Sequence, residues 1–492
     1  MLRNRAGLPR RASRTTHRRG AIATAFAVAA TAMLGIAALA TESGVWLLAR
    51  RNAQNAADAA AYGGTLVLAQ RPPLRTVAMA EGAARETVTL NGFTAGTGTT
   101  VTAAAGTWNP AARTFTAGGT LPNAMRVDIT QNQRGGFARL ISTTAPQAWG
   151  GATAALVDAG VACTLSIPPP GGSTSQVNGT TLITGSASLT APDCVIVSNA
   201  GALRSVDIGT NAAGSLRAAQ IRASGECENC DAIPRDQLPG GVLDYHPPAT
   251  NPYTALDDRA ANPMSGLVCT NPVYRDAAGV ILPRVQRGNR SLPPSGWVTV
   301  QPVPRTSATP AGVIPAICED ISPGNGQRVH FAPGTNYFDG QSLQMSSPGA
   351  SVTGTGVTLV LTGSTAGDVG NIQLSGGTFT LIAPTAGSGV PGVYDGVVIY
   401  RDVLGEVSNS ANDAIRIEGN TTSTLFGGVY APTSEIQISG NTNTNPPAGA
   451  SGGCTAYVGG RITFTGNSTI DITACPLTGT NVPVIQNVVL VQ

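Results

Sequence analysis

The longest apolar run of the chain lies near its start, from Ala21 to Ala40, and holds twenty residues without a charge. As a helix rising about 1.5 Å per residue, such a run crosses the hydrocarbon core of a bilayer. A periodic pattern continues past it at alternating spacings of three and four residues. The pattern predicts one unbroken helix over residues 20–71, a membrane anchor that continues as a stalk. The seam positions are Trp46, Ala49, Ala53, Ala56, Ala60, Gly63 and Val67.

Most side chains of this seam are small, so another helix can approach it closely. Arg50, Arg51, Gln54, Asn55 and Asp58 lie off the seam. The sequence therefore predicts that the seam contacts another protein and that the remaining helix surface does not.

Beyond Pro72 the pattern shortens. A helical stretch, 75–90, stops at the turn signal Asn91-Gly92, and short strands such as Met125–Ile129 follow. These features predict a small α/β or mainly β unit over 72–160.

From Cys163 onward, short Thr, Ser, Val and Ile runs alternate with Gly or Asn, first over 161–236 and again over 327–492. Strands starting near Gly356, Gly377 and Gly396 are about 20 residues apart, a period typical of stacked repeats. We expect a mainly β body built as a parallel β-solenoid, or β-helix. A β-sandwich is the alternative, because strand spacing does not determine connectivity.

The stretch between these two segments, 237–326, is rich in proline and poor in strand-like runs. It is predicted to be an irregular connector that Cys269 and Cys318 could clamp.

The segment 1–19 is basic and carries no acidic residue. By the positive-inside rule this tail stays in the cytoplasm, and the rest of the chain lies on the other side of the membrane. A cleavable secretory signal ending at Ala38-Leu39-Ala40 is the alternative. The length of the run and the continuing helix pattern favour an anchor. The arginines of the tail are Arg3, Arg5, Arg10, Arg11, Arg14, Arg18 and Arg19.

The net charge of the exported part limits which classes of molecule we expect it to bind. Without the seven arginines of the tail, 23 basic residues face 27 acidic ones, so the exported part is slightly acidic and nucleic acid is not an expected partner. Only 12% of the residues are charged, and there are 61 glycines, as in β-rich proteins with many turns.

Eight cysteines, an even number, predict disulfides outside the cytoplasm. Sequence alone leaves the pairing open, and pairing of neighbours is the economical solution. The Cys227-x-x-Cys230 motif could also be redox-active or half of a zinc site. No second such motif and no thioredoxin-like pattern accompany it, so a structural loop staple is expected. The neighbouring pairs are Cys163–Cys194, Cys227–Cys230, Cys269–Cys318 and Cys454–Cys475.

No catalytic motif, metal site or cofactor site is recognisable around the three histidines, His17, His246 and His330. Some β-helical enzymes cleave polysaccharides with clustered carboxylates, which is the enzymatic alternative. The acids here are scattered along the chain, so we expect no enzyme, and fold analogy alone does not establish one. The acids considered are Asp257, Asp258, Asp402, Asp413, Glu418 and Glu435.

The N-terminal features together resemble the TadG-like proteins of the tight-adherence (Tad, or Flp) pilus system. The matching elements are Arg19-Gly20, the apolar span, Glu42 with Gly44, and the string from Gln54 to Ala61 (QNAADAAA). The family usually has Asp at the position of Glu42. Segments in the C-terminal half also fit: Pro333–Tyr337, Gly354–Thr358 and Gly427–Pro432.

The resemblance implies a pilus-assembly component of the bacterial inner membrane that meets other pilus proteins through its N-terminal helix. It also implies a single span, a cytoplasmic N-terminus and a periplasmic bulk. The D-x-S-x-S motif of a von Willebrand A-type domain, which some relatives carry, does not occur. Two alternatives stay open: an exported β-helix that binds or cleaves polysaccharide, and a secreted adhesin. Whether the β-rich body binds a glycan is left open as well.

Overall fold

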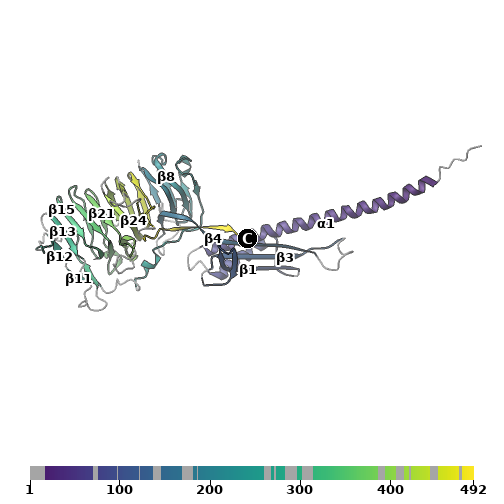
Figure 1. Cartoon of the computed structure of the whole chain (residues 1–492), viewed down its shortest axis with the longest axis horizontal. Coiled ribbons are helices and arrows are strands. Elements are labelled where there is room, and N and C mark those ends of the chain that lie inside the picture. The colour runs from purple at the N-terminus through teal and green to yellow at the C-terminus, as the bar shows by residue number, and fades with distance from the viewer. Residues whose placement is uncertain are drawn as a thin grey trace, which may run out of the picture. The chain divides into compact units, whose positions relative to one another are not determined.

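The computed structural model describes most of the chain (Figure 1). It divides into two compact units, Met1–Leu156 with Val488–Gln492, and Val157–Asn487. The described residues are 17–69, 76–96, 98–120, 122–136, 146–168, 181–185, 187–259, 267–270, 273–276, 278–282, 296–301, 314–385, 394–405, 415–419, 423–440, 442–443, 453–475 and 479–491.

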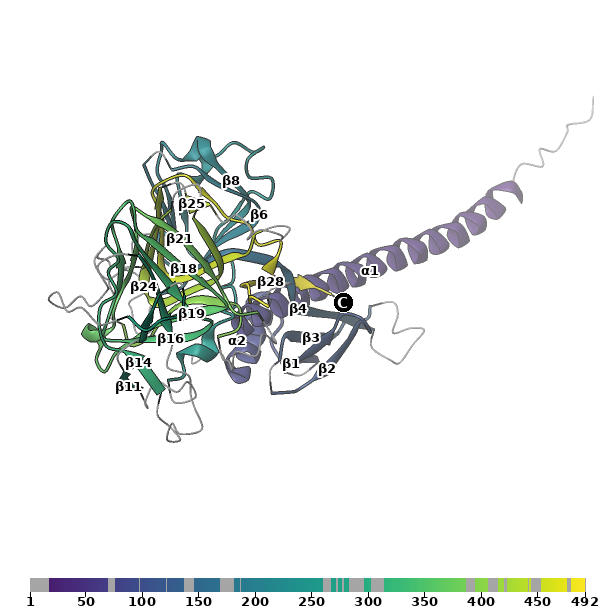
Figure 2. The ribbon, with the colours of Figure 1, turned by 60° about the vertical axis from the view of Figure 1, so that its left-hand side comes forward.

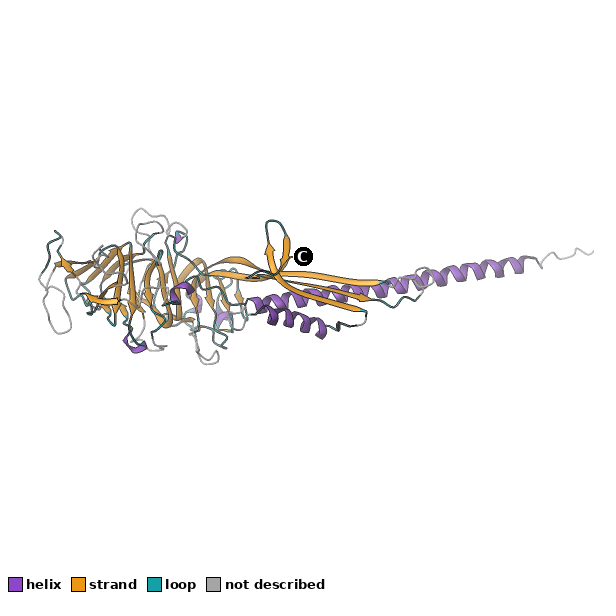
Figure 3. Cartoon of the chain, turned by 90° about the horizontal axis from the view of Figure 1, so that it is seen from below, coloured by secondary structure: helices purple, strands orange, loops and turns teal. Residues whose placement is uncertain are grey.

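The first unit packs two helices on an antiparallel sheet of strand order β2-β1-β3-β4 (Figure 3). Its elements are α1 (His17–Leu68), α2 (Val77–Leu90), β1 (Thr99–Asn109), β2 (Thr114–Ala117), β3 (Ala124–Asn132) and the first part of β4 (Gln147–Ser166). Val127 of β3 pairs with Ala103 on one side and with Ala152 on the other, so β3 is central in the sheet. This agrees with the expected α/β unit, with α1 as an additional layer.

Local signals in the sequence explain where α2, the shorter helix, begins and ends. The Thr76 hydroxyl accepts a hydrogen bond from the Met79 backbone N–H at 3.1 Å, a typical N-cap. The helix stops at Asn91, and Gly92 follows with a φ of +88°, a conformation that glycine adopts without strain. Ala80, Ala84 and Val88 form its buried stripe at helical spacing.

The second unit is almost entirely β. Its strands after β4 are β5 (Thr181–Ile183), β6 (Leu189–Ser198), β7 (Val206–Ile208), β8 (Leu216–Ala223), β9 (Cys227–Glu228), β10 (Val242–Leu243), β11 (Leu267–Thr270), β12 (Val273–Arg275), β13 (Gly296–Gln301), β14 (Ile314–Ile317), β15 (Gln327–Phe331), β16 (Gly334–Asp339), β17 (Leu343–Met345), β18 (Ser351–Thr355), β19 (Val357–Thr362), β20 (Ile372–Leu374), β21 (Thr378–Ile382), β22 (Val397–Arg401), β23 (Ile415–Gly419), β24 (Thr424–Gly440), β25 (Thr442–Asn443), β26 (Thr455–Phe464), β27 (Ser468–Thr469) and β28 (Val484–Leu490).

Nearly all of these strands pair in parallel, and the pairings form three ladders. Figure 2 shows these strands gathered in one body. One ladder is β13-β15-β18-β21-β24. The second is β11-β14-β16-β19-β22-β24-β26-β4-β6-β8-β10. The third is β17-β20-β23-β24-β26-β5-β7-β9.

The order of the second and third ladders differs from the order of the sequence at one place. Strand β26, near the end of the chain, pairs with β4 and β5 near the start of the unit: Tyr457 lies opposite Thr164, and Ile462 opposite Thr181. Strands of the segments 161–236 and 327–492, which the sequence separates by a proline-rich stretch, therefore pair directly with each other. We call the β26–β4/β5 pairing the closure seam.

Residues 237–326 are also more regular than predicted. Strands β11, β13 and β14 fall within this stretch and pair with the ladders. The strands themselves contain strand-forming side chains, such as Val298 and Val300 of β13, but the many prolines around them hide this signal in the composition of the whole stretch.

The core of the second unit consists of apolar side chains repeated at matching register. Val329, Val352 and Phe379 are register partners in successive strands, and all are fully buried or nearly so. The offset between partners is 23 residues from Tyr337 to Val360 and 40 from Val360 to Tyr400. The interval of about 20 residues seen in the sequence separates β19 from β21 and β21 from β22, and β21 belongs to a different ladder from the other two. This interval is therefore not the length of one repeat.

All eight cysteines are joined in disulfides: Cys163–Cys194, Cys227–Cys230, Cys269–Cys318 and Cys454–Cys475. These are the neighbouring pairs. Cys163 and Cys454 lie in the strands and turns on the two sides of the closure seam, where a covalent cross-link limits how far the local chain can open.

Candidate interaction sites

The N-terminal part of α1 has the surface of a membrane-spanning helix. The stretch Ile22–Leu68 contains an 18-residue window with a mean hydropathy of 2.1, and none of that window is buried. Ile22, Phe26 and Leu34 are each about 70% exposed. The hydroxyl of Thr31 donates to the Ala27 carbonyl at 2.8 Å, which satisfies this polar group within the helix, as lipid requires.

Glu42 lies just after the apolar run and bonds to the segment that follows β3 in the same unit. Its Oε1 accepts a hydrogen bond of 2.6 Å from the backbone N–H of Gly136, in the segment that follows β3. A carboxylate close to a segment that could span a membrane is costly to leave unpaired, and the Gly136 N–H supplies a partner for it.

The seam predicted for a partner protein is used within this chain. Ala53, Ala56 and Ala60 are at most 1% exposed because they pack on the sheet and on α2. Ala57 and Ala61, which lie off the predicted seam, are buried equally. Trp46, Ala49, Gly63 and Val67 are half-buried. The 3-4 spacing does mark buried positions of α1. The buried face is wider than a helix–helix seam, however, because α1 packs on a sheet as well as on a helix.

Small residues at this interface bring backbones together. A Cβ placed on Gly150 of β4 would lie 2.4 Å from the carbonyl carbon of Ala53. One placed on Gly64 would lie 2.9 Å from Met125 and 3.1 Å from Ala84. Such distances leave no room for any side chain, so the alanines and glycines of the QNAADAAA region serve close packing within the domain.

Gln54 adds a polar link in the same region. Its Nε2 donates to the Gly151 carbonyl at 2.9 Å, and its Oε1 accepts from the Gly151 N–H at 3.2 Å. Nε2 also donates to Oδ1 of Asp58 at 2.7 Å. Sequence reasoning placed Gln54 and Asp58 outside the contact surface, although their order in the motif was a usable signal.

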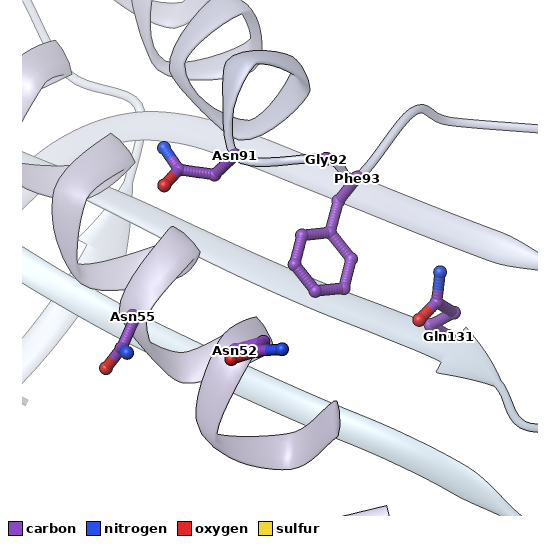
Figure 4. A pocket seen from close by; sticks show the side chains of 6 residues that line it. All are labelled: Asn52, Asn55, Asn91, Gly92, Phe93 and Gln131. Carbon is purple, nitrogen blue, oxygen red and sulfur yellow. The ribbon is translucent and has the colours of Figure 1, made fainter. Parts of the chain in front are cut away.

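One open pocket, of about 310 Å³, lies in the first unit (Figure 4). It is lined by α1, by the turn between α2 and β1, and by β3. None of its lining side chains is charged: Asn52, Asn55, Asn91, Gly92, Phe93 and Gln131. Sequence reasoning missed this pocket because its residues come from three separate segments.

The acids considered for catalysis are held by partners inside the second unit. Asp402 is fully buried, lies 3.0 Å from Nε of Arg259 and accepts from the Thr362 hydroxyl at 2.6 Å. Asp257 accepts from the Tyr430 hydroxyl at 2.7 Å. These contacts secure the segment 246–259 against the face of the ladders.

Glu418 pairs with Arg416 at 3.0 Å, and Glu435 lies 3.7 Å from Arg461. Asp413 lies outside the described residues.

A cluster of tyrosines lies beside Asp257 and Asp402. The pKa of the Tyr400 hydroxyl is raised chiefly by burial and further by the negative charges of these two carboxylates. The rings of Tyr400 and Tyr430 stack there with centroids 5.5 Å apart, and the Tyr253 ring packs against Tyr430 at a tilt, with centroids 5.3 Å apart. This cluster is a packed interior rather than an open cleft.

The described residues contain one grouping with metal-ligand spacing, Cys269, Cys318 and Asp339. Its two sulfurs are bonded to each other, so they are not thiolate ligands.

The two histidines whose side chains are described sit in hydrogen-bonded positions. His246 Nε2 lies 3.0 Å from Nη1 of Arg222, and its Nδ1 lies 3.0 Å from the Pro247 carbonyl oxygen. His330 Nδ1 lies 2.9 Å from the Thr353 hydroxyl. Burial lowers the pKa of both imidazoles. His17 begins α1, and its side chain is outside the described part.

Comparison with known families matches one region of the chain. Residues 49–154 fit a family model described as "Putative Tad-like Flp pilus-assembly". This range runs from the buried half of α1 to β4, so it nearly coincides with the folded part of the first unit. No curated protein and no solved structure matches the chain.

Proposed function

We propose that this protein, which carries a Tad-like Flp pilus-assembly domain over residues 49–154, is a structural component of a Tad pilus anchored in the inner membrane. The observation that carries the proposal is the division of α1 into two halves. The first half exposes an apolar surface, since none of its most apolar 18-residue window is buried, and the second half is the core helix of the matched domain. One continuous helix thus joins a membrane span rigidly to a folded domain.

The orientation follows from the charge of the tail. Seven arginines precede the span, and the chain after it carries disulfides. Both features favour a cytoplasmic N-terminus and a periplasmic body.

The body is interpreted as a parallel β-solenoid. Three ladders of parallel strands with aligned apolar side chains support this assignment. A stack of this kind offers a long, rigid surface and is suited to structural work. Four of the carboxylates considered for catalysis contact arginine or hydroxyl groups, which favours a structural role over polysaccharide cleavage. They are Asp257, Asp402, Glu418 and Glu435.

With the buried half of α1 used inside the domain, contact with other pilus proteins is assigned to the exposed half, from Ile22 to about Arg51. Leu34, Leu47 and Leu48 belong to this surface and are 59–71% exposed.

Membrane fractionation tests the proposal. In the native bacterium, carbonate-washed membranes should retain the full chain, and its N-terminal sequence should include the residues before Ala40. External protease added to spheroplasts should digest the body and leave only a short fragment. A tagged chain in which the span is replaced by a cleavable signal serves as the control for a soluble body. Recovery of a native form that starts at Thr41 would contradict the anchor and support a secreted adhesin.

Loss of the gene should abolish assembled pili while leaving pilin synthesis intact, and the anchored chain should restore them. A strain that assembles normal pili without the protein would refute the pilus role, even if the anchor were correct.

A further inference from the structure

The motif QNAADAAA leaves two positions without a structural explanation, Asn55 and Ala59, and only Asn55 has a polar side chain. Gln54 and Asp58 hold β4, and the alanines at 56, 57, 60 and 61 are buried. Asn55 has no hydrogen bond in the described structure and is exposed, as is Asn52 one turn earlier. Both line the pocket of the first unit.

The opposite wall of the pocket also presents carboxamides. Asn91 uses its Nδ2 to cap the Thr87 carbonyl at 2.8 Å, which leaves its Oδ1 available to a ligand. Gln131 extends from β3, and its Oε1 accepts from Gln133 at 3.1 Å. Figure 4 shows the Phe93 ring directed from the α2–β1 turn toward α1, between these groups.

The lining determines the class of ligand. No charge faces the pocket, so neither a phosphate nor a metal cation finds a counter-charge there. An extended peptide cannot add to β3, because β3 is hydrogen-bonded to β1 on one side and to β4 on the other. Carboxamides both donate and accept, which matches the hydroxyl groups of a sugar. At Gly92 no atom lies within 4 Å of a Cβ position, so a ring can approach the backbone.

We propose that the pocket of Asn52, Asn55, Asn91 and Gln131 binds a neutral saccharide chain. The inference goes beyond the role in pilus assembly. It concerns the domain of residues 49–154 rather than the β-rich body.

The test uses the full chain in a detergent without a sugar headgroup, titrated with β-1,4-linked tetramers of N-acetylglucosamine and, separately, of glucose. Saturation-transfer NMR and calorimetry detect binding. The two tetramers distinguish an amino-sugar glycan from a plain glucan, and binding of either one supports the proposal. The double variant Asn52→Ala/Asn55→Ala should weaken binding about tenfold or more, since it removes two pairs of hydrogen-bonding groups.

Glu86→Ala is the matched control, because Glu86 is exposed on α2 of the same unit and lies outside the pocket. It should bind like the wild type. Both asparagines are exposed, so the double variant should keep the wild-type thermal midpoint. The proposal is overturned if neither tetramer binds, or if the double variant binds as well as the control.

Discussion

The side chain of Gln54 on α1 and the backbone of Gly151 on β4 form a reciprocal pair of hydrogen bonds, 2.9 Å from Nε2 to the carbonyl oxygen and 3.2 Å from the N–H to Oε1. The amide of the helix thus occupies the place of a peptide group beside the strand. Because Gly150 allows the α1 backbone within contact distance of β4, the pair is partly sheltered from water.

Replacing Gln54 with alanine should therefore loosen β4. The loss leaves the two polar groups of Gly151 without these partners, and we expect a cost of about 1–3 kcal/mol in local stability. Hydrogen exchange of the β4 amides measures it. Asn55→Ala, one residue away and exposed, is the control and should leave the exchange rates unchanged.

Leucine substitutions at the buried alanines of α1 should all destabilise the first unit by similar amounts. Ala53→Leu, Ala56→Leu and Ala57→Leu each force extra methylenes into a packed interface, for about 1–3 kcal/mol of destabilisation, whereas the exposed Ala59→Leu should be neutral. Limited proteolysis of the first unit in the full chain reports the difference. If Ala57→Leu behaves like Ala59→Leu, the helix packs through the narrow seam expected from the sequence and not through the wider face.

Arg259 and Asp402 hold the segment 246–259 to the ladders. Asp402→Ala removes the buried acceptor of the Thr362 hydroxyl and the carboxylate partner of the partly exposed Arg259, and it should cost about 1–3 kcal/mol, the range for an unsatisfied buried polar group. Glu418→Ala breaks the more exposed pair with Arg416, whose cost should stay within about 1 kcal/mol. Thermal unfolding of the two variants, compared side by side, checks the ranking, and equal shifts would count against a buried role for Asp402.

The disulfides should be complete in the exported protein. Alkylating reagents should modify none of the eight cysteines until reductant is added. Removing Cys454–Cys475, which spans 21 residues, should cost about 3 kcal/mol, more than removing the short Cys227–Cys230 link. Free thiols at Cys227 and Cys230 in protein from the native host would indicate redox or metal chemistry instead.

Acid should weaken the second unit through His246. Its pKa is lowered below 6.5 by burial, with the charge of Arg222 acting in the same direction. The imidazole therefore binds a proton more readily in the unfolded chain than in the folded one. Its contribution to the free energy of unfolding is fully present above about pH 6.5 and is lost as the pH falls through the lowered pKa of the folded state. NMR titration of the imidazole and unfolding at several pH values test this.

His246→Gln should flatten the pH dependence only in part. The pKa of His330 is lowered in the same direction by burial, so this residue contributes a second, independent loss in acid. The variant His246→Gln/His330→Gln should remove most of the slope between pH 7 and pH 5 that histidines produce.

The sequence by itself determined the features that depend on neighbours along the chain. An uncharged run of twenty residues and a 3-4 spacing predict a helix whatever surrounds it, and α1 follows both. The QNAADAAA string and its distance from the span indicated the pilus family. The short strand runs indicated a mainly β body, and the neighbouring cysteines are the ones that pair.

Only the tertiary structure decided what each surface faces. Helical spacing shows that Ala53, Ala56 and Ala60 share a face but not whether that face meets another protein or the chain's own sheet. The closure seam between Tyr457 and Thr164 joins strands nearly 300 residues apart, and no local pattern encodes such a pairing. Asn52, Asn91 and Gln131 likewise meet in one pocket because three separate elements pack together. Backbone hydrogen bonds and close packing select these partners, and both depend on the whole fold being in place.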